Sequence, residues 1–169
     1  LAGSTDAFLL LRAREVGFGD AYLPLLWAAL HLVKAGTSMW GGRLSDRWGR
    51  RKLLVVGWLL YSLVYAGFAA VGQPVLVLLL FVLYGFFFGL TEGASRAVIA
   101  DWVPPERRGR AFGWIGAVEG TGLILASVVG GYLWDQTNSA AWTFGMGAAF
   151  SGVAGVGLMI ALIRQRRSS

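Results

Sequence analysis

Long uncharged apolar runs, separated by short basic clusters, are the feature that most limits how this sequence can fold. The run from Leu53 to Val71 holds 19 residues without one charged side chain, and after the turn Gly72–Pro74 the next run stays uncharged until Glu92. A helix needs about 20 apolar residues to cross the roughly 30 Å of hydrocarbon in a bilayer. The pattern therefore predicts helices that span a membrane.

Composition supports a membrane protein and excludes several other classes. Hydrophobic residues make up 56% of the chain and charged residues 14%, against about 45–50% and 25% in soluble domains. The net charge is +6, but the arginines lie at the ends of apolar runs and form no patch with stacking aromatics, so nucleic-acid binding is not expected. The chain has no cysteine and the single histidine His31, which argues against a disulfide framework and a metal cluster. No cofactor is expected.

The sequence predicts an all-α membrane protein with five complete transmembrane helices and a truncated first one. A single transmembrane domain is expected over 1–169, with helices at about 1–11 (partial), 21–41, 53–71, 75–100, 111–134 and 140–163. The first piece is too short to span, and since the chain does not begin with methionine, we expect that upstream sequence is missing. The predicted connections are loops at 42–52 and 101–110, and a tail follows at 164–169.

The basic residues predict which side of the membrane each connection occupies. When the predicted loops are numbered in alternation, one side collects eleven basic residues: Arg43, Arg47, Arg50, Arg51, Lys52, Arg107, Arg108, Arg110, Arg164, Arg166 and Arg167. The other side holds Arg12 and Arg14. Basic loops stay in the cytoplasm. The two basic loops and the carboxy terminus are therefore predicted to be cytoplasmic, in a plasma or inner membrane.

Two basic segments carry a family resemblance. The segment Gly42–Lys52 reads GRLSDRWGRRK, and its pattern G-x-L-x-D-R-x-G-R-R between two spanning helices resembles the signature loop of the Major Facilitator Superfamily. The segment Asp101–Gly113, DWVPPERRGRAFG, is similar to that family's loop between its tenth and eleventh helices. Together they place the chain at the family's partial seventh to twelfth helices, which covers essentially the whole sequence.

The resemblance implies a fold of two six-helix halves, of which this chain is the carboxy-terminal one, with substrate bound between them and exposed to each side in turn. It also implies that the first motif helps close the cytoplasmic side, a gating role assigned here to Gly42, Asp46, Arg47, Gly49 and Arg50. The implied partners are the missing amino-terminal six-helix half, the lipid bilayer, a small-molecule substrate and protons.

Small residues recur at helical spacing on two predicted helices. Gly85, Gly89 and Gly93 follow one another every four residues, and Gly116 and Gly120 form a similar pair. Such stripes let a second helix backbone approach closely in lipid. We expect ordinary helix packing here; the alternative is that these smooth faces permit helices to slide during transport.

Four ionisable residues lie in the predicted cytoplasmic half of the helices, at a depth where charges are costly and usually mark a pathway or a pair. At ~1.5 Å per residue from the basic loops, Lys34 lies about 12 Å deep, Glu92 about 13 Å, Arg96 about 7 Å and Glu119 about 13 Å. One interpretation is a Glu92–Arg96 pair at i,i+4 spacing, helped by Lys34 and Glu119. The other is a charged cavity cluster, in which Glu119 or Glu92 takes up protons and Lys34 or Arg96 attracts an anionic substrate.

Two further polar residues stay open at this point. Asp6, in the truncated first helix and nearer the outer side, is a separate cavity candidate, and the alternative is a helix-turn role with Ser4 and Thr5. His31 lies one turn before Lys34, and a plain packing role is expected for it.

The function expected from these features is secondary active transport of a small solute by alternating access, coupled to protons, as a symporter or an antiporter. No phosphate-binding Gly-rich loop is present, which argues against an ATP-driven pump, and no enzyme activity is expected. The alternatives are a non-transporting membrane scaffold of the same fold, an intramembrane enzyme that uses Glu92, Glu119 and His31, and a half that works alone as a homodimer.

Overall fold

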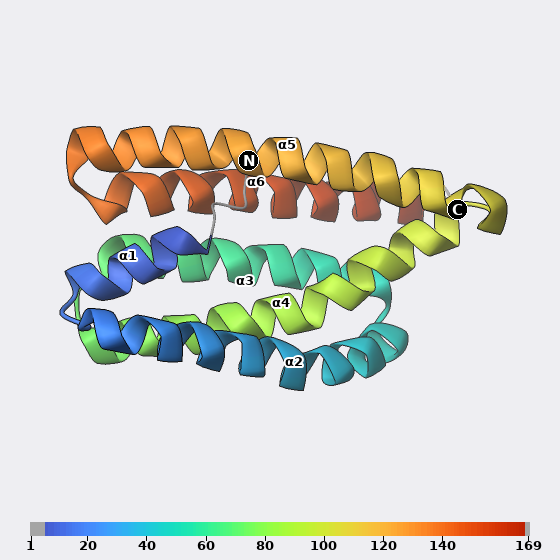
Figure 1. Cartoon of the computed structure of the whole chain (residues 1–169). Coiled ribbons are helices and arrows are strands. Elements are labelled where there is room, and N and C mark those ends of the chain that lie inside the picture. Colours follow the sequence, from blue (N-terminus) through green and yellow to red (C-terminus); the bar gives the residue numbers. More distant parts are fainter. Residues whose placement is uncertain (1–5, 168–169) are drawn as a thin grey trace.

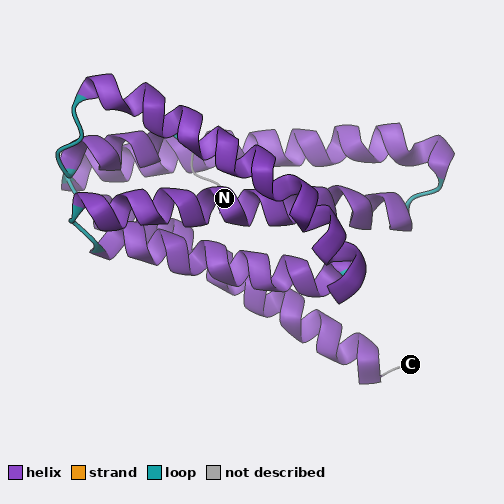
Figure 2. Cartoon of the chain, turned by 90° about the horizontal axis from the view of Figure 1, so that it is seen from below, coloured by secondary structure: helices purple, strands orange, loops and turns teal. Residues whose placement is uncertain are grey.

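The described part of the chain is helical almost throughout. The computed structural model describes residues 6–167, and within that range it contains helices and short connections but no strand (Figures 1 and 2). The α-helices are α1 (Ala7–Glu15), α2 (Leu23–Trp48), α3 (Arg50–Ala70), α4 (Pro74–Trp102), α5 (Arg108–Thr137) and α6 (Ala140–Arg167), with 3-10 turns η1 (Asp20–Tyr22) and η2 (Pro105–Arg107). The predicted all-α class is confirmed.

Within residues 6–167, four helical segments are long and apolar enough to cross a bilayer. They are Arg50–Ala70, Pro74–Trp102, Pro105–Thr137 and Ala140–Ala161. Helix α2 is also long enough, at 26 residues, but it does not join this group. Lys34 and the charged residues that follow Gly42 lower its apolar content.

The connection between α2 and α3 is much shorter than the sequence predicted. A loop was expected over 42–52, but α2 continues to Trp48 and α3 begins at Arg50, so that Gly49 alone joins them. Gly49 has φ 89°, a conformation that favours glycine over residues with a Cβ. The prediction was wrong because polar residues do not end a helix by themselves; water can satisfy a helix that leaves the membrane, and only the backbone break at Gly49 ends it.

Other helices also extend past the ends that the sequence predicted, because polar residues alone do not end a helix. Helix α4 runs to Trp102 and α5 begins at Arg108, so most of the loop expected over 101–110 is either helix or the η2 turn. Helix α6 extends to Arg167 through most of the expected tail. The first helix was expected over 1–11, whereas α1 runs from Ala7 to Glu15, and residues 1–5 lie outside the described part.

The helices pack in a defined arrangement. Helix α3 lies along α6, α2 lies along α4, and α3 also contacts α4. In Figure 1 the α2–α3 and α4–α5 connections and the carboxy-terminal end of α6 lie at one end of the bundle, and the other three connections lie at the opposite end. This is the alternation on which the predicted orientation depends; which end faces the cytoplasm stays a prediction.

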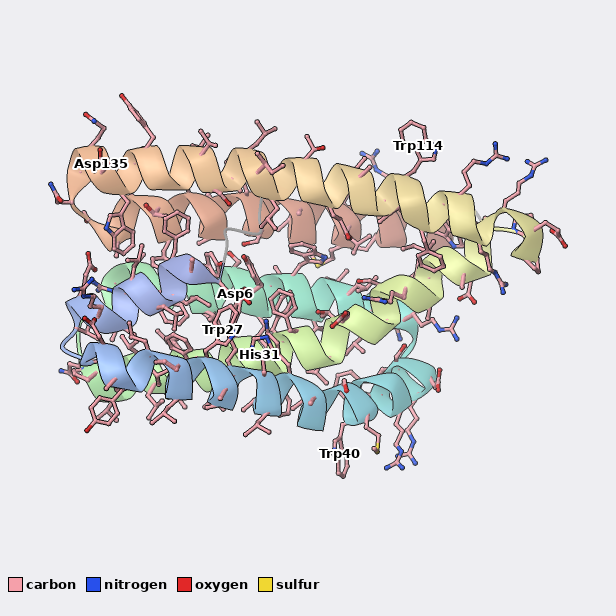
Figure 3. The ribbon with its side chains drawn as sticks, in the orientation of Figure 1. Asp6, Trp27, His31, Trp40, Trp114 and Asp135 are labelled. Atoms are coloured by element: carbon pink, nitrogen blue, oxygen red, sulfur yellow. The ribbon has the colours of Figure 1, made fainter. Side chains whose placement is uncertain are left out.

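Aromatic rings fill the core where α3, α4 and α6 meet. Tyr61 stacks on Tyr65 with ring centroids 4.2 Å apart, and Phe68 stacks on Phe144 at 5.3 Å. Helix α5 contributes little to this core, because its buried residues are the small Ala126 and Gly130. Trp114 of α5 points away from the bundle, as does Trp40 on the opposite side (Figure 3). Much of α5 is therefore not covered by the described helices.

Candidate functional site

Three helices meet at the partly buried carboxylate of Asp6. Asp6, immediately before α1, accepts a hydrogen bond at Oδ2 from Lys34 Nζ of α2, 2.9 Å away, and at Oδ1 from the hydroxyl of Tyr84 on α4. The side chains of Lys34 and Asp6 are 18% and 22% exposed, and Tyr84 is buried. We call these three residues the Asp6 cluster.

The ammonium of Lys34 also lies against aromatic rings. Its Nζ is 4.3 Å from the ring centroid of Phe88 and 5.4 Å from that of Tyr84. Ring faces attract cations, and they do so more strongly where water is excluded. The partly buried charge of Lys34 is therefore neutralised by one carboxylate and supported by two rings.

Glycines bring α2 close enough to α4 to form this cluster. A Cβ placed on Gly89 would lie 2.7 Å from Thr37 Cβ and 3.0 Å from the Lys34 carbonyl oxygen, and one placed on Gly41 would overlap the backbone of Gly89. Gly85 lies against Val33 in the same contact. These positions need glycine because the two backbones nearly touch.

The pairing of Asp6 with Lys34 differs from what the sequence indicated. Lys34 was expected at the depth of Glu92 and Glu119, with Asp6 a separate candidate nearer the other side. That depth was measured from Gly42, whereas α2 continues to Trp48. Lys34 therefore lies about 21 Å from the helix end at ~1.5 Å per residue, far enough along to reach Asp6. Tyr84 was missed, because a tyrosine inside an apolar run gives no local sign of a distant carboxylate.

The charges on α4 form a local pair. Arg96 Nη2 lies 2.8 Å from Glu92 Oε1, and the two side chains are 72% and 57% exposed. The i,i+4 spacing therefore produces the pair that one interpretation expected. Lys34 does not join it, because it binds Asp6. Glu119 is exposed on α5, and no ion pair to it is found within residues 6–167.

The first basic motif is held by contacts inside this chain. Arg50 forms an ion pair with Asp101 at the end of α4, and its Nη1 also donates to the Ala97 carbonyl oxygen at 3.4 Å. Its Nη2 lies 3.9 Å from Oδ1 of Asp46, whose side chain is 73% exposed. Arg50 begins α3 and Asp101 lies near the end of α4, so this ion pair joins two helices of the chain. Contacts of the motif with a missing half stay a prediction. The gating role itself stays a prediction.

The other residues singled out from the sequence lie apart from these contacts. Gly42, Arg47 and Gly49 are exposed around the α2–α3 junction. Three of the predicted packing glycines have open space where a Cβ would stand: Gly93, Gly116 and Gly120. Unlike Gly85 and Gly89, they do not pack against another described helix.

His31 is exposed rather than packed in the core. Its Nδ1 lies 2.9 Å from the Trp27 carbonyl oxygen, and the two rings are 4.8 Å apart on the same helix (Figure 3). Within the described residues, no group of three or more histidine, aspartate or glutamate side chains is arranged to hold a metal ion.

Comparison with known proteins identifies several relatives. The chain is 32% identical to an uncharacterized MFS-type transporter of Methanocaldococcus jannaschii over 86% of its length, which covers 38% of that relative. It is 32% identical to the uncharacterized MFS-type transporter YhjO of Bacillus subtilis over 84% of its length, 35% of that protein. It is 29% identical to the quinolone resistance protein NorA of Staphylococcus aureus over 92% of its length, 39% of that protein.

The chain thus spans less than two fifths of each of these relatives. The sequence profile of the Major Facilitator Superfamily matches residues 5–169, nearly the whole chain. Its helices are those of an integral membrane protein, and its relatives are transporters rather than enzymes. Apolar helices, the two basic motifs and the profile match agree, and the chain belongs to the Major Facilitator Superfamily.

Proposed function

We propose that this chain is the carboxy-terminal half of a secondary transporter that moves a small solute by alternating access, coupled to protons. The observation that carries the proposal is the exposure of Glu92, Arg96 and Glu119 at membrane depth. Glu92 lies about 15 Å from the end of α4, and Glu119 lies about 16 Å from the start of α5, at ~1.5 Å per residue.

Such charges are not stable against lipid. A charged side chain at the centre of a bilayer costs about 2.5–3.5 kcal/mol or more, and charged groups therefore face water or other protein. The exposed faces of α4 and α5 that carry these charges must therefore contact water or another part of the protein. A water-filled cavity between two six-helix halves, as in this family, supplies it, with the amino-terminal half as the partner.

The two basic motifs support assignment to the carboxy-terminal half. Gly42–Lys52 and Asp101–Gly113 occur at the helix count of the family's second motif copy and its loop after the tenth helix. The basic residues at that end of the bundle support a cytoplasmic location for it and for the carboxy terminus. In this arrangement Gly42, Asp46, Arg47, Gly49 and Arg50 close the cytoplasmic side.

The relative named for quinolone resistance suggests the first substrate to test. At 29% identity it does not identify the cargo of this chain, but a fluorescent quinolone is a practical probe. The intact transporter would be reconstituted into proteoliposomes, and movement of the quinolone and of a panel of small solutes would be followed under an imposed pH gradient.

We expect gradient-driven transport of at least one solute, and we expect Glu119→Gln to abolish it at normal expression. Glu106→Gln, which removes an exposed carboxylate from the η2 turn, is the matched control and should transport normally. Unchanged transport and pH dependence in Glu119→Gln would contradict coupling through Glu119. If no solute moves in the unaltered protein, the proposal of secondary transport is wrong and a scaffold role is favoured.

A further inference from the structure

Helix α3 exposes one face along its whole length, and that face is apolar beyond its first residues. The exposed residues of α3 are Arg51, Lys52, Val56, Leu59, Leu63, Ala66 and Ala70. From Lys52 onward they follow one another at steps of four and three residues, which places them on one side of the helix. Other sides of α3 pack against α4 and α6. We call the exposed side the α3 outer face.

The length and chemistry of the α3 outer face fit a bilayer. Lys52 and Ala70 are 18 residues apart, or about 27 Å at ~1.5 Å per residue, which is close to the roughly 30 Å of hydrocarbon. No charged or polar side chain is exposed on α3 between them, whereas α4 and α5 expose Glu92, Arg96 and Glu119. Lipid chains therefore suit the α3 outer face, with Lys52 at the level of the lipid headgroups.

Two basic residues and an aromatic ring stand at the headgroup end of this face. The guanidinium of Arg51 lies over the ring of Trp102, 5.2 Å from its centroid, and Lys52 follows Arg51 directly. Trp102, the last residue of α4, is 66% exposed. Tryptophan rings favour the membrane interface, and their faces attract cations. We call Arg51, Lys52 and Trp102 the Arg51 corner.

The carboxylates of this region are held by a neighbouring arginine. Asp101, which precedes Trp102, forms an ion pair with Arg50, and Asp46 lies 3.9 Å from the same guanidinium. Five basic residues of the first motif stand against these two carboxylates, which leaves an excess of three positive charges. The charge of the region is therefore complementary to an anion.

We propose that the Arg51 corner binds the headgroup of an anionic phospholipid, whose acyl chains lie along the α3 outer face. A guanidinium presents five N–H donors in a planar fork that matches the oxygens of a phosphate, and the Lys52 ammonium adds a second positive charge. A phospholipid carries its phosphate directly above its acyl chains, which is the order of the corner and the outer face. A zwitterionic lipid carries a cation of its own, which the excess positive charge repels.

The second basic motif provides a comparison with the same charge. Arg107, Arg108 and Arg110 are exposed, but they lead into α5, on which Glu119 is exposed within the span. Among the described residues, the one arginine found over an aromatic ring is Arg51. Removing Arg107 and Arg110 therefore changes the charge of the chain as much as removing Arg51 and Lys52, without altering the corner.

The direct test is native mass spectrometry of the purified intact transporter, titrated with phosphatidylglycerol or with phosphatidylcholine of the same acyl chains. We expect the unaltered protein to bind phosphatidylglycerol more tightly. Arg51→Gln combined with Lys52→Gln should weaken its tightest binding about fivefold for each basic residue removed, and so about thirtyfold in all. Arg107→Gln combined with Arg110→Gln should keep it. Equal losses in the two double variants, or no loss in the first, would overturn the proposal.

Single variants separate the parts of the site. Arg51→Lys keeps the charge and loses the planar fork, and Trp102→Leu keeps both cations and removes the ring. Each should weaken phosphatidylglycerol binding, but by less than the double variant. Val56→Asn places an amide on the α3 outer face, at a position that is 49% exposed, and should weaken both lipids alike. Unchanged binding of both lipids in Val56→Asn, at unchanged helix content, would contradict the proposal and indicate that protein covers this face.

Inorganic phosphate distinguishes a lipid headgroup from a free phosphate ion. It offers the same oxygens to the Arg51 corner but has no acyl chains for the α3 outer face, so an excess of it should not displace phosphatidylglycerol. Displacement would overturn the proposal and assign the corner to free phosphate. None of these measurements needs a transported solute. A transporter that moves none would therefore contradict the proposed function and leave the lipid site standing.

Discussion

Two ion pairs in this bundle share the same chemistry but differ in what they join. Lys34 and Asp6 link α2 to the start of α1, with 18% and 22% of their side chains exposed, whereas Arg96 and Glu92 lie on one helix with 72% and 57% exposed. The first pair also has Tyr84 and two aromatic rings around it. The second pair has only its own i,i+4 spacing.

The difference shows that burial decides how much an ion pair in this bundle contributes to stability. An exposed i,i+4 pair contributes about 0.3–0.5 kcal/mol, while removing one partner of a buried pair costs about 3–5 kcal/mol. The Asp6 cluster lies nearer the second limit, reduced by its residual exposure. Stability should therefore depend more on the Asp6 cluster than on the Glu92–Arg96 pair.

The largest effect is expected from Lys34→Met. It leaves the partly buried Asp6 carboxylate without its ammonium, and we expect the free energy of unfolding at neutral pH to fall by at most about 3 kcal/mol, the low end of the range for buried pairs. The measurement is detergent-induced unfolding of the purified intact transporter. Arg96→Met is the matched control. Equal losses in the two variants would show that burial does not separate the pairs.

The next effect is expected from Gly89→Leu. Its side chain would collide with Thr37 and approach the Lys34 carbonyl oxygen, which forces α2 from α4 and displaces Lys34. Overpacking of this kind costs about 1–3 kcal/mol. Gly93→Leu, one turn further along α4, meets open space and should change stability little. If Gly93→Leu lowers the stability as much as Gly89→Leu in the same assay, the close α2–α4 contact does not explain the effect of Gly89→Leu.

The smallest effect is expected from the Glu92–Arg96 pair itself. A double-mutant cycle with Glu92→Gln and Arg96→Met should give a coupling energy of about 0.3–0.5 kcal/mol. The same cycle with Asp6→Asn and Lys34→Met should give a clearly larger value. A Glu92–Arg96 coupling as large as that of Asp6–Lys34 would remove the distinction between the two pairs.

Local features were predictable from the sequence. The apolar runs predicted the helices, because hydropathy depends only on neighbouring residues, and the spacing of Glu92 and Arg96 predicted their pair. The ends of α2 and α3 were not predictable in this way. A charged stretch can be helix or loop once it leaves the lipid, and the backbone break lies at Gly49 alone.

By itself the sequence determined that this is a helical membrane protein of the Major Facilitator Superfamily, with its two basic motifs at alternate helix connections and so at one end of the bundle. Only the tertiary structure decided which charges meet. Asp6 lies 28 residues from Lys34 and 78 from Tyr84, and Arg50 lies 51 from Asp101. The physical reason is that these contacts depend on where α2 and α3 end and begin and on how closely the glycines of α2 and α4 let those two helices approach, and both are properties of the packed helices.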